Sequence, residues 1–149
     1  MTHPGHVTAP CIAVLETGTS IGRGVFAVDA IPAGAVVETA PIVLLEVAQQ
    51  PFPQTIRRMV FNWTQTHFAL ALGCGSIYNH ADQPNLRYSR DYSRQAIRFT
   101  ALKNIEPGEQ LTISYDQTAA GNQPRERGWF EIHQIEKIKV EAASTGNSR

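Results

Sequence analysis

The stretch ALGCGSIYNHADQPN, residues 71–85, carries the strongest indication of the fold. Asn79 and His80 stand between an apolar run and a Pro-Asn turn, and together they offer hydrogen-bond donors and acceptors at one point. Gly73 and Gly75 lack side chains, so other backbone can approach closely just before this pair. A hydrogen-bonded structural histidine is the alternative for His80 taken alone. The stretch predicts a crowded polar site.

Two other segments combine glycine or tyrosine with strand-like sequence. SIGRGVF, residues 20–26, holds Gly22 and Gly24, but it lacks the third glycine and the following helix of a dinucleotide-binding fingerprint. GEQLTISYD, residues 108–116, is typical of a strand that ends on Tyr115. Simple turns are the alternative for the glycine pair, and surface packing is the alternative for Tyr115.

The composition predicts one soluble domain. The 149 residues carry 13 Lys and Arg against 13 Asp and Glu, and the 42% hydrophobic content excludes a disordered chain. Scattered basic residues argue against direct nucleic-acid binding, and the apolar runs are too short for a membrane helix. The N-terminus does not read as a signal peptide, so we expect a cytoplasmic protein, with a nuclear or host-nuclear location left open. A homodimer is also left open.

The two cysteines lie 63 positions apart, and neither has a partner at the spacing of a zinc site, so no metal is expected. We expect a flexible N-terminus over residues 1–10, the folded domain over residues 11–140 and a flexible tail over residues 141–149.

Short apolar runs bounded by Gly or Pro predict a mainly β domain. The predicted strands are Cys11–Leu15, Gly24–Val28, Val36–Val37 with Ile42–Leu45, Ala96–Leu102 and Gln110–Tyr115. Apolar residues at helical spacing predict one helix over Gln54–Thr66, and a second short helix could start near Pro124.

An internal echo joins two parts of the chain. Residues 27–34, AVDAIPAG, match residues 101–108, ALKNIEPG, at a constant offset of 74. Each unit has one Ile followed by a Pro/Gly turn. The turn at 106–109 fits type II with Gly108 at its third position, and the turn at 31–34 fits type I with Gly34 at its fourth. Two such units suit a barrel or clip of short strands.

Taken in order, G-R-G-V-F-A, N-H-x-x-x-P-N and G-E-x-L-T-x-x-Y resemble the SET-domain protein-lysine methyltransferases over residues 11–133. The likeness is greatest to compact bacterial and viral members. It implies a β-clip of short strands with a knot-like crossing, in which the Asn-His segment passes beneath the Tyr strand. It also implies S-adenosylmethionine as cofactor and a protein substrate that presents a lysine.

The resemblance assigns roles to single residues. The cofactor would lie against Gly22, Arg23, Gly24, Asn79, His80 and Tyr115, with Trp129 or Phe130 covering its adenine. Tyr115 would be catalytic, at the junction of the cofactor pocket and the lysine channel. Tyr88 resembles a family channel tyrosine, whereas Tyr78, Phe61 and Trp63 are looser candidates for the channel, and Ile113 stands where the number of methyl groups is influenced. Ordinary packing is the alternative for Trp129 and Phe130.

The chemistry required is modest. A lysine ammonium has no lone pair, and an apolar channel beside a sulfonium lowers its pKa, so no strong general base is needed. Departures from the family are Ser114, where Asp is frequent, and the lack of a cysteine-rich segment after the Tyr strand. A catalytically silent SET-like module that binds a protein through its groove is the alternative function.

Overall fold

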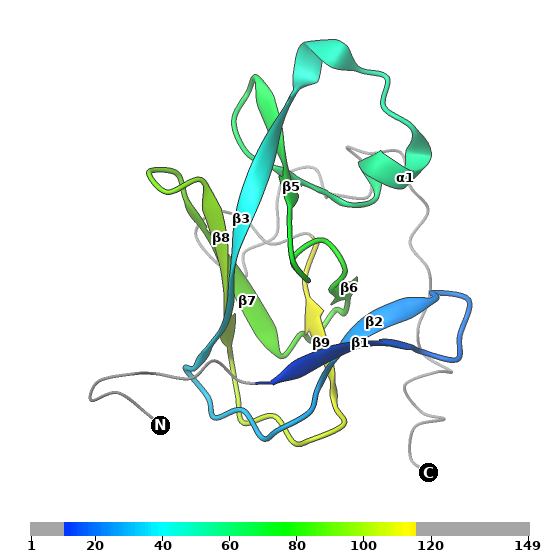
Figure 1. The fold of residues 1–149 in the computed structure, drawn as a ribbon, viewed down its shortest axis with the longest axis vertical. Coiled ribbons are helices and arrows are strands. Elements are labelled where there is room, and N and C mark those ends of the chain that lie inside the picture. Colours follow the sequence, from blue (N-terminus) through cyan, green and yellow to red (C-terminus); the bar gives the residue numbers. More distant parts are fainter. Residues whose placement is uncertain (1–10, 116–149) are drawn as a thin grey trace, which may run out of the picture.

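The computed structural model describes residues 11–115, which form nine strands and two short helices (Figure 1). The elements are β1 (Ile12–Glu16), β2 (Arg23–Ala27), β3 (Val36–Glu46), η1 (Val47–Gln49), α1 (Gln54–Arg57), β4 (Val60–Asn62), β5 (His67–Ala71), β6 (Asn79–His80), β7 (Leu86–Asp91), β8 (Ala96–Ala101) and β9 (Gln110–Ile113). The predicted mainly β fold is therefore confirmed for this part of the chain.

The strands form two sheets that share one core. One sheet has the order β1-β2-β9-β6, and the other has the order β4-β5-β3-β8-β7. In Figure 1 the long strand β3 runs through the larger sheet, and β1, β2 and β9 lie together below it. The largest fully buried side chains come from both sheets and from the segments between them: Tyr78, Phe99, Ile31, Leu86, Ile97, Ile105, Leu111, Ile113 and Val25. Their burial supplies the main driving force for folding.

β3 is one strand of eleven residues where the sequence predicted two pieces, Val36–Val37 and Ile42–Leu45, with residues 38–41 between them. Its first half, through Pro41, pairs with β8, and its second half, from Ile42, pairs with β5. Proline has no N–H to give to a ladder, so it fits where the strand changes partner. The predicted interruption was wrong, because β3 continues through the proline and changes its partner there from β8 to β5.

The predicted helix over Gln54–Thr66 was wrong beyond its first turn. α1 ends at Arg57, and residues Val60–Asn62 form β4, which pairs with β5. No side chain caps the helix start, which follows Pro53. Val60 and Phe61 favour strands and bury against the sheet, so tertiary pairing overrides a marginal helical pattern.

Besides β4, the strands β5, β6 and β7 were missing from the prediction. β5 is a nearly unbroken apolar run, which carries no period of its own. In β7, Leu86 and Tyr88 are buried whereas Arg87 and Ser89 are exposed, the alternation typical of a half-buried strand. The signal for β7 was therefore present in the sequence.

The internal echo corresponds to a pseudo-twofold pairing of the two units. Ile31 and Ile105 form a bridge through mutual backbone hydrogen bonds of 2.9 and 2.8 Å. Gly108 N donates to Ala27 O at 2.7 Å, and Gly34 N donates to Ala101 O at 2.8 Å, which is the same contact shifted by 74 positions. The repeat therefore marks two segments that hold each other.

Both turns of the echo have glycine at the third position. Gly34 and Gly108 have φ of 85° and 86°, and the turns close through Ala35 N to Pro32 O and Glu109 N to Glu106 O. The type II turn predicted at 106–109 fits this geometry. The type I turn predicted at 31–34 was wrong, because the turn begins one residue later, at Pro32.

β6 and β9, the segments at which the resemblance places the crossing of the chain, pair in parallel with Asn79 opposite Thr112. Asn85, directly before β7, is 6% exposed. Its Nδ2 donates to Gln110 O at 2.9 Å, and Thr112 N donates to its Oδ1 at 2.9 Å. This one side chain therefore fastens the connection between β6 and β7 to the backbone of β9.

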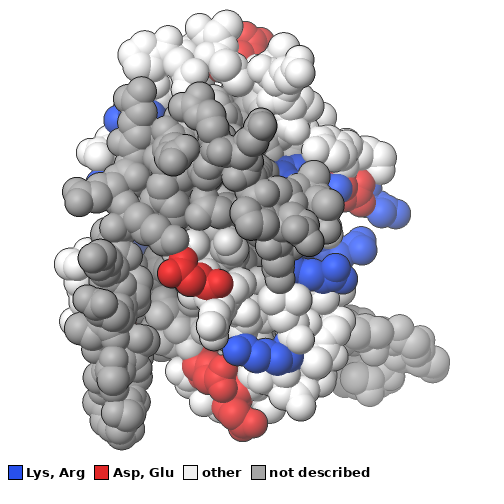
Figure 2. Space-filling view, turned by 180° about the vertical axis from the view of Figure 1, so that it is seen from behind, with Lys and Arg blue, Asp and Glu red and all other residues white. Residues whose placement is uncertain are grey.

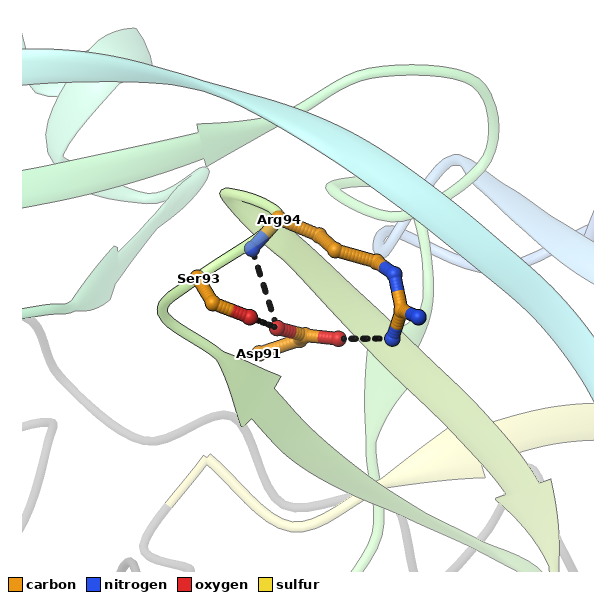
Figure 3. A network of polar contacts seen from close by, with 3 residues as sticks. All are labelled: Asp91, Ser93 and Arg94. Carbon is orange, nitrogen blue, oxygen red and sulfur yellow. Dashed lines mark hydrogen bonds and ion pairs between the residues drawn. The ribbon is translucent and has the colours of Figure 1, made fainter.

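The β7–β8 hairpin is closed by a network around Asp91 (Figure 3). Its carboxylate accepts hydrogen bonds from Arg94 N, Ser93 Oγ and Arg94 Nη1 at 3.0, 2.8 and 3.0 Å. The backbone hydrogen bond from Arg94, followed by the bond from Ser93, lowers the pKa of Asp91 to about 2.

We expect this turn to stabilise the fold above about pH 4 and to lose that contribution as the pH falls. The folded pKa, about 2, lies below the unfolded value, so the charged form is favoured by folding and protonation weakens the turn. We measure unfolding midpoints of the wild type and Asp91→Ala from pH 7 to pH 2. The difference between the two midpoints should shrink as the pH falls from about 4 to about 2. A constant difference across that range would show that the charge of Asp91 does not matter.

Figure 2 shows basic side chains at its right, on the side of the β7–β8 hairpin, and others elsewhere on the same face. The hairpin carries Arg87, Arg90, Arg94 and Arg98. Two of them are engaged within the protein, since Arg94 pairs with Asp91 and Arg90 Nε donates to Asn62 O at 2.7 Å.

Among residues 11–115 no helix is long and apolar enough to cross a membrane.

Candidate functional site

A small cavity opens between β4, the turn before β6, β7 and the end of β9. Its empty space is about 270 Å³, open mouth included. The lining residues are Arg58, Met59, Val60, Phe61, Gly75, Ser76, Tyr78, Tyr88 and Tyr115. Four of the residues proposed from the sequence thus meet at one place, and the other wall comes from the segment that was predicted as a helix.

Four of the nine lining residues are aromatic: Phe61, Tyr78, Tyr88 and Tyr115. Phe61 contacts Tyr88 edge-on with ring centroids 5.1 Å apart. The ring centroid of Tyr78 lies 4.5 Å from that of the buried Phe99. Such pairs add packing energy beyond the area that they bury. An apolar, aromatic-walled cavity suits an aliphatic chain that ends in an amine.

Tyr115 presents a neutral phenol to the cavity. Its hydroxyl donates to Tyr78 O at 2.9 Å. Burial raises the pKa of Tyr115 to about 12, with a smaller contribution from Tyr88. The phenol therefore keeps its proton near neutral pH, so it is not a base there. Its oxygen, with the proton directed to Tyr78, can accept a hydrogen bond from a further donor.

Both ring nitrogens of His80 are engaged inside the protein. Tyr115 N donates to Nδ1 at 3.1 Å, so the ring proton belongs on Nε2, which lies 2.9 Å from Asp82 Oδ1. The imidazole also packs on the Tyr115 ring at 5.3 Å. The side chain thus positions the backbone of Tyr115.

Asn79, on β6, bonds to both β2 and β9 of the smaller sheet. Its Nδ2 donates to Arg23 O and to Gln110 Oε1, each at 2.9 Å. Gly24 makes this approach feasible, since a Cβ there would lie 2.9 Å from Asn79 Nδ2 and would also strike Gln110 Oε1. Within residues 11–115, no group donates to Asn79 Oδ1.

Some proposed residues lie elsewhere. Trp63 is buried and packs against Tyr92 at 4.6 Å, away from the cavity lining. Ile113 is fully buried in the core and does not line the cavity. Trp129, Phe130 and the helix expected near Pro124 lie outside the described residues.

Sequence reasoning missed the residues that β4 and its approach bring to the cavity. Met59 and Val60 were assigned to a helix face. The strand-favouring residues Val60 and Phe61, directly after Met59, were the available signal. It also missed Glu38, whose carboxylate accepts a hydrogen bond from Tyr78 OH at 2.8 Å. Nothing local to Glu38 marks a contact 40 positions away. Within residues 11–115, no three His, Cys, Asp or Glu side chains gather as they would to hold a metal ion.

Comparison with known proteins agrees with this geometry. Residues 22–116 match the SET domain family. A Schizosaccharomyces pombe protein, "Histone-lysine N-methyltransferase, H3 lysine-37 specific", is 34% identical over 97 residues, which are 63% of this chain and 66% of that protein. A SET and MYND domain-containing protein of Dictyostelium discoideum is 39% identical over 61 residues, 37% of this chain and 12% of that protein.

Solved structures share the fold at lower identity. A Plasmodium falciparum protein described as a candidate histone methyltransferase superposes with a TM-score of 0.61 at 23% identity, over 75% of this chain and 97% of that one. A chain of ctPRC2 in an autoinhibited conformation bound to S-adenosylmethionine also gives 0.61, at 21% identity, over 72% of this chain and 15% of that one. Together with the family match over residues 22–116, these findings show that the chain belongs to the SET-domain family.

Proposed function

We propose that this protein transfers methyl groups from S-adenosylmethionine to the side-chain amine of a lysine in a protein substrate. The observation that carries the proposal is the neutral Tyr115 phenol in an aromatic cavity, with its proton committed to Tyr78 O. The family match and the S. pombe relative, named as a histone-lysine N-methyltransferase, support the same reaction.

The residues present fit the cofactor at the smaller sheet. The amide N–H groups of Asn79 donate to Arg23 O and Gln110 Oε1. Its Oδ1 would therefore accept a hydrogen bond from the ammonium group at the amino-acid end of the cofactor. The backbone of Arg23 borders the same point. At Gly22 the space a side chain would take is open, while its own N–H and carbonyl bond to Thr19 O and Thr17 N in the loop before β2. When bound, the cofactor supplies the methyl group on a sulfonium.

The protein's part in the reaction is to align a neutral amine. At pH 7.5 about one free lysine in a thousand is neutral, and an apolar cavity beside a positive sulfonium shifts that balance toward the amine. The Tyr115 oxygen accepts an N–H hydrogen bond and so directs the nitrogen lone pair away from itself. Much of the rate enhancement would come from this alignment.

The substrate class follows from the relatives only as a starting point. The S. pombe protein is named for a lysine of histone H3, and this chain spans about two thirds of that protein and an eighth of the D. discoideum one. We therefore propose that histone H3 is the first substrate to test, beside non-histone proteins that present exposed lysines.

Replacing Asn79 by Ala should weaken S-adenosylmethionine binding about ten- to a hundredfold. The change removes the acceptor for the ammonium, and a hydrogen bond to a charged group contributes about 1.5–3 kcal/mol. Titration calorimetry on the wild type and the variant measures the effect, with a melting curve to show that both are folded.

Asn62→Ala is the matched control, since Asn62 lies on β4 and does not line the cavity. Its affinity for the cofactor should equal that of the wild type. Equal affinities for Asn79→Ala and wild type would remove Asn79 from the cofactor site, and no binding by the wild type would refute the proposed function.

A further inference from the structure

The carboxylate of Glu38 lies where two segments of the cavity wall are held. Glu38 follows a bulge in β3, at which the register with β8 shifts between Val36 and Glu38. Bulges redirect the side chains that follow them and are frequent next to active sites. From this position Glu38 faces the turn before β6, on the same side of the strand as the buried Ala40.

Each carboxylate oxygen has its own partner. Oε1 accepts from Tyr78 OH at 2.8 Å, and Oε2 accepts from Cys74 N at 2.9 Å. The approach is close, since a side chain at Gly73 would strike Oε2. One carboxylate thus fastens both ends of the segment 74–78.

The segment 74–78 forms a large part of the cavity. Gly75, Ser76 and Tyr78 line it, and Tyr78 O receives the Tyr115 hydroxyl. Tyr78 is 1% exposed, and burial, followed by the charge of Glu38, raises the pKa of its phenol far above the usual range. The phenol therefore stays a donor to Glu38 throughout the working pH range.

We infer that Glu38 is a positioning residue that fixes the position of the Tyr115 hydroxyl through Tyr78. The path is continuous: the carboxylate holds the Tyr78 phenol and Cys74 N, and the carbonyl of the same Tyr78 holds the hydroxyl of Tyr115. A hydrogen bond from a phenol to a carboxylate is charge-assisted and stronger than a neutral one. In its kinetic form the inference rests on the proposed methyl transfer.

The kinetic test compares Glu38→Gln, Glu38→Ala and Tyr78→Phe. Gln keeps an acceptor for one partner but not for both, so kcat should fall about threefold to tenfold in Glu38→Gln and about ten- to a hundredfold in Glu38→Ala. The KM values for cofactor and peptide should stay within threefold, because neither substrate touches Glu38. Tyr78→Phe combined with Glu38→Gln should lose less than the product of the two single effects, since both remove one contact.

Glu46→Gln is the control, since Glu46 lies on the same strand and is exposed. Its kcat should equal that of the wild type. If kcat of a folded Glu38→Ala stays within threefold of the wild type, or if the KM values rise as much as kcat falls, the positioning role is refuted.

A second readout does not depend on methylation. With tyrosines labelled at Cζ, the resonance of Tyr115 should shift in Glu38→Gln and stay in place in Glu46→Gln, with assignments from single Tyr→Phe variants of the four tyrosines. An unmoved Tyr115 resonance in Glu38→Gln overturns the inference. If the Tyr115 resonance shifts in Glu38→Gln but the wild-type protein transfers no methyl groups, the positioning role of Glu38 is upheld and the proposed function is refuted.

Discussion

Replacement of Tyr115 by Phe is expected to lower methyl transfer by about a hundred- to a thousandfold while the fold and the affinity for cofactor persist. Only the phenol oxygen of the cavity is lost, and with it the acceptor that we propose aligns the amine. Loss of one well-placed hydrogen bond in a transition state typically costs about that much in rate. Single-turnover methylation measures the effect, because it isolates the chemical step from product release.

Tyr92→Phe is the matched control for this experiment. Tyr92 is 53% exposed, and its hydroxyl donates to Trp63 O at 3.3 Å, outside the cavity. Its rate should equal that of the wild type. A Tyr115→Phe rate within threefold of the wild type would remove the phenol oxygen from the reaction.

Replacement of Asn85 by Ala is expected to cause the largest loss of stability in the described part of the chain. It leaves Gln110 O and Thr112 N, backbone groups of two half-buried residues, without the side chain that holds them now. An unsatisfied group costs about 1–3 kcal/mol when it is fully buried, so the variant should lose at most about 6 kcal/mol of the 5–15 kcal/mol that stabilise a typical domain. Urea midpoints measure the difference, and Asn85→Asp, which keeps the acceptor, should fall between the two.

Asn104→Ala is the control for Asn85. Its Oδ1 also accepts from a backbone group, Ala33 N at 2.9 Å, but the site is exposed to water. Water can replace that contact, so the loss should stay within about 1 kcal/mol. Equal losses in Asn85→Ala and Asn104→Ala would mean that the crossing of β6 and β9 does not depend on the buried amide.

The strands that the sequence predicted well are those whose apolar runs end at turn residues. β1, β2 and β8 lie within about one residue of the predicted ranges, and the repeat at offset 74 identified two units that bond to each other. The turn chemistry of Gly108 was readable because only a few turn types accept Pro followed by Gly. Local pattern sufficed for these elements.

The cavity could not be predicted in full, because contacts between distant segments create it. Phe61 reaches it only because Val60–Asn62 pairs with β5 and leaves the helical pattern. Trp63, two residues on in the chain, turns to Tyr92 instead. Periodicity does not distinguish these two aromatic residues.

The polar contacts of the site also depend on the crossing. His80 meets Tyr115 across 35 positions, and Glu38 meets Tyr78 across 40. The resemblance to SET domains suggested which residues gather, but the roles of the His80 ring and of Glu38 follow from the geometry of their hydrogen bonds.

The most direct test of the account is to incubate the protein with methyl-labelled S-adenosylmethionine and histone H3, beside other lysine-bearing proteins, and to locate the label by tandem mass spectrometry. We expect the label on a lysine side-chain nitrogen, with none transferred by Tyr115→Phe in the same time. A wild-type protein that binds the cofactor but labels no lysine in any of these substrates, or that labels another type of side chain, would contradict it.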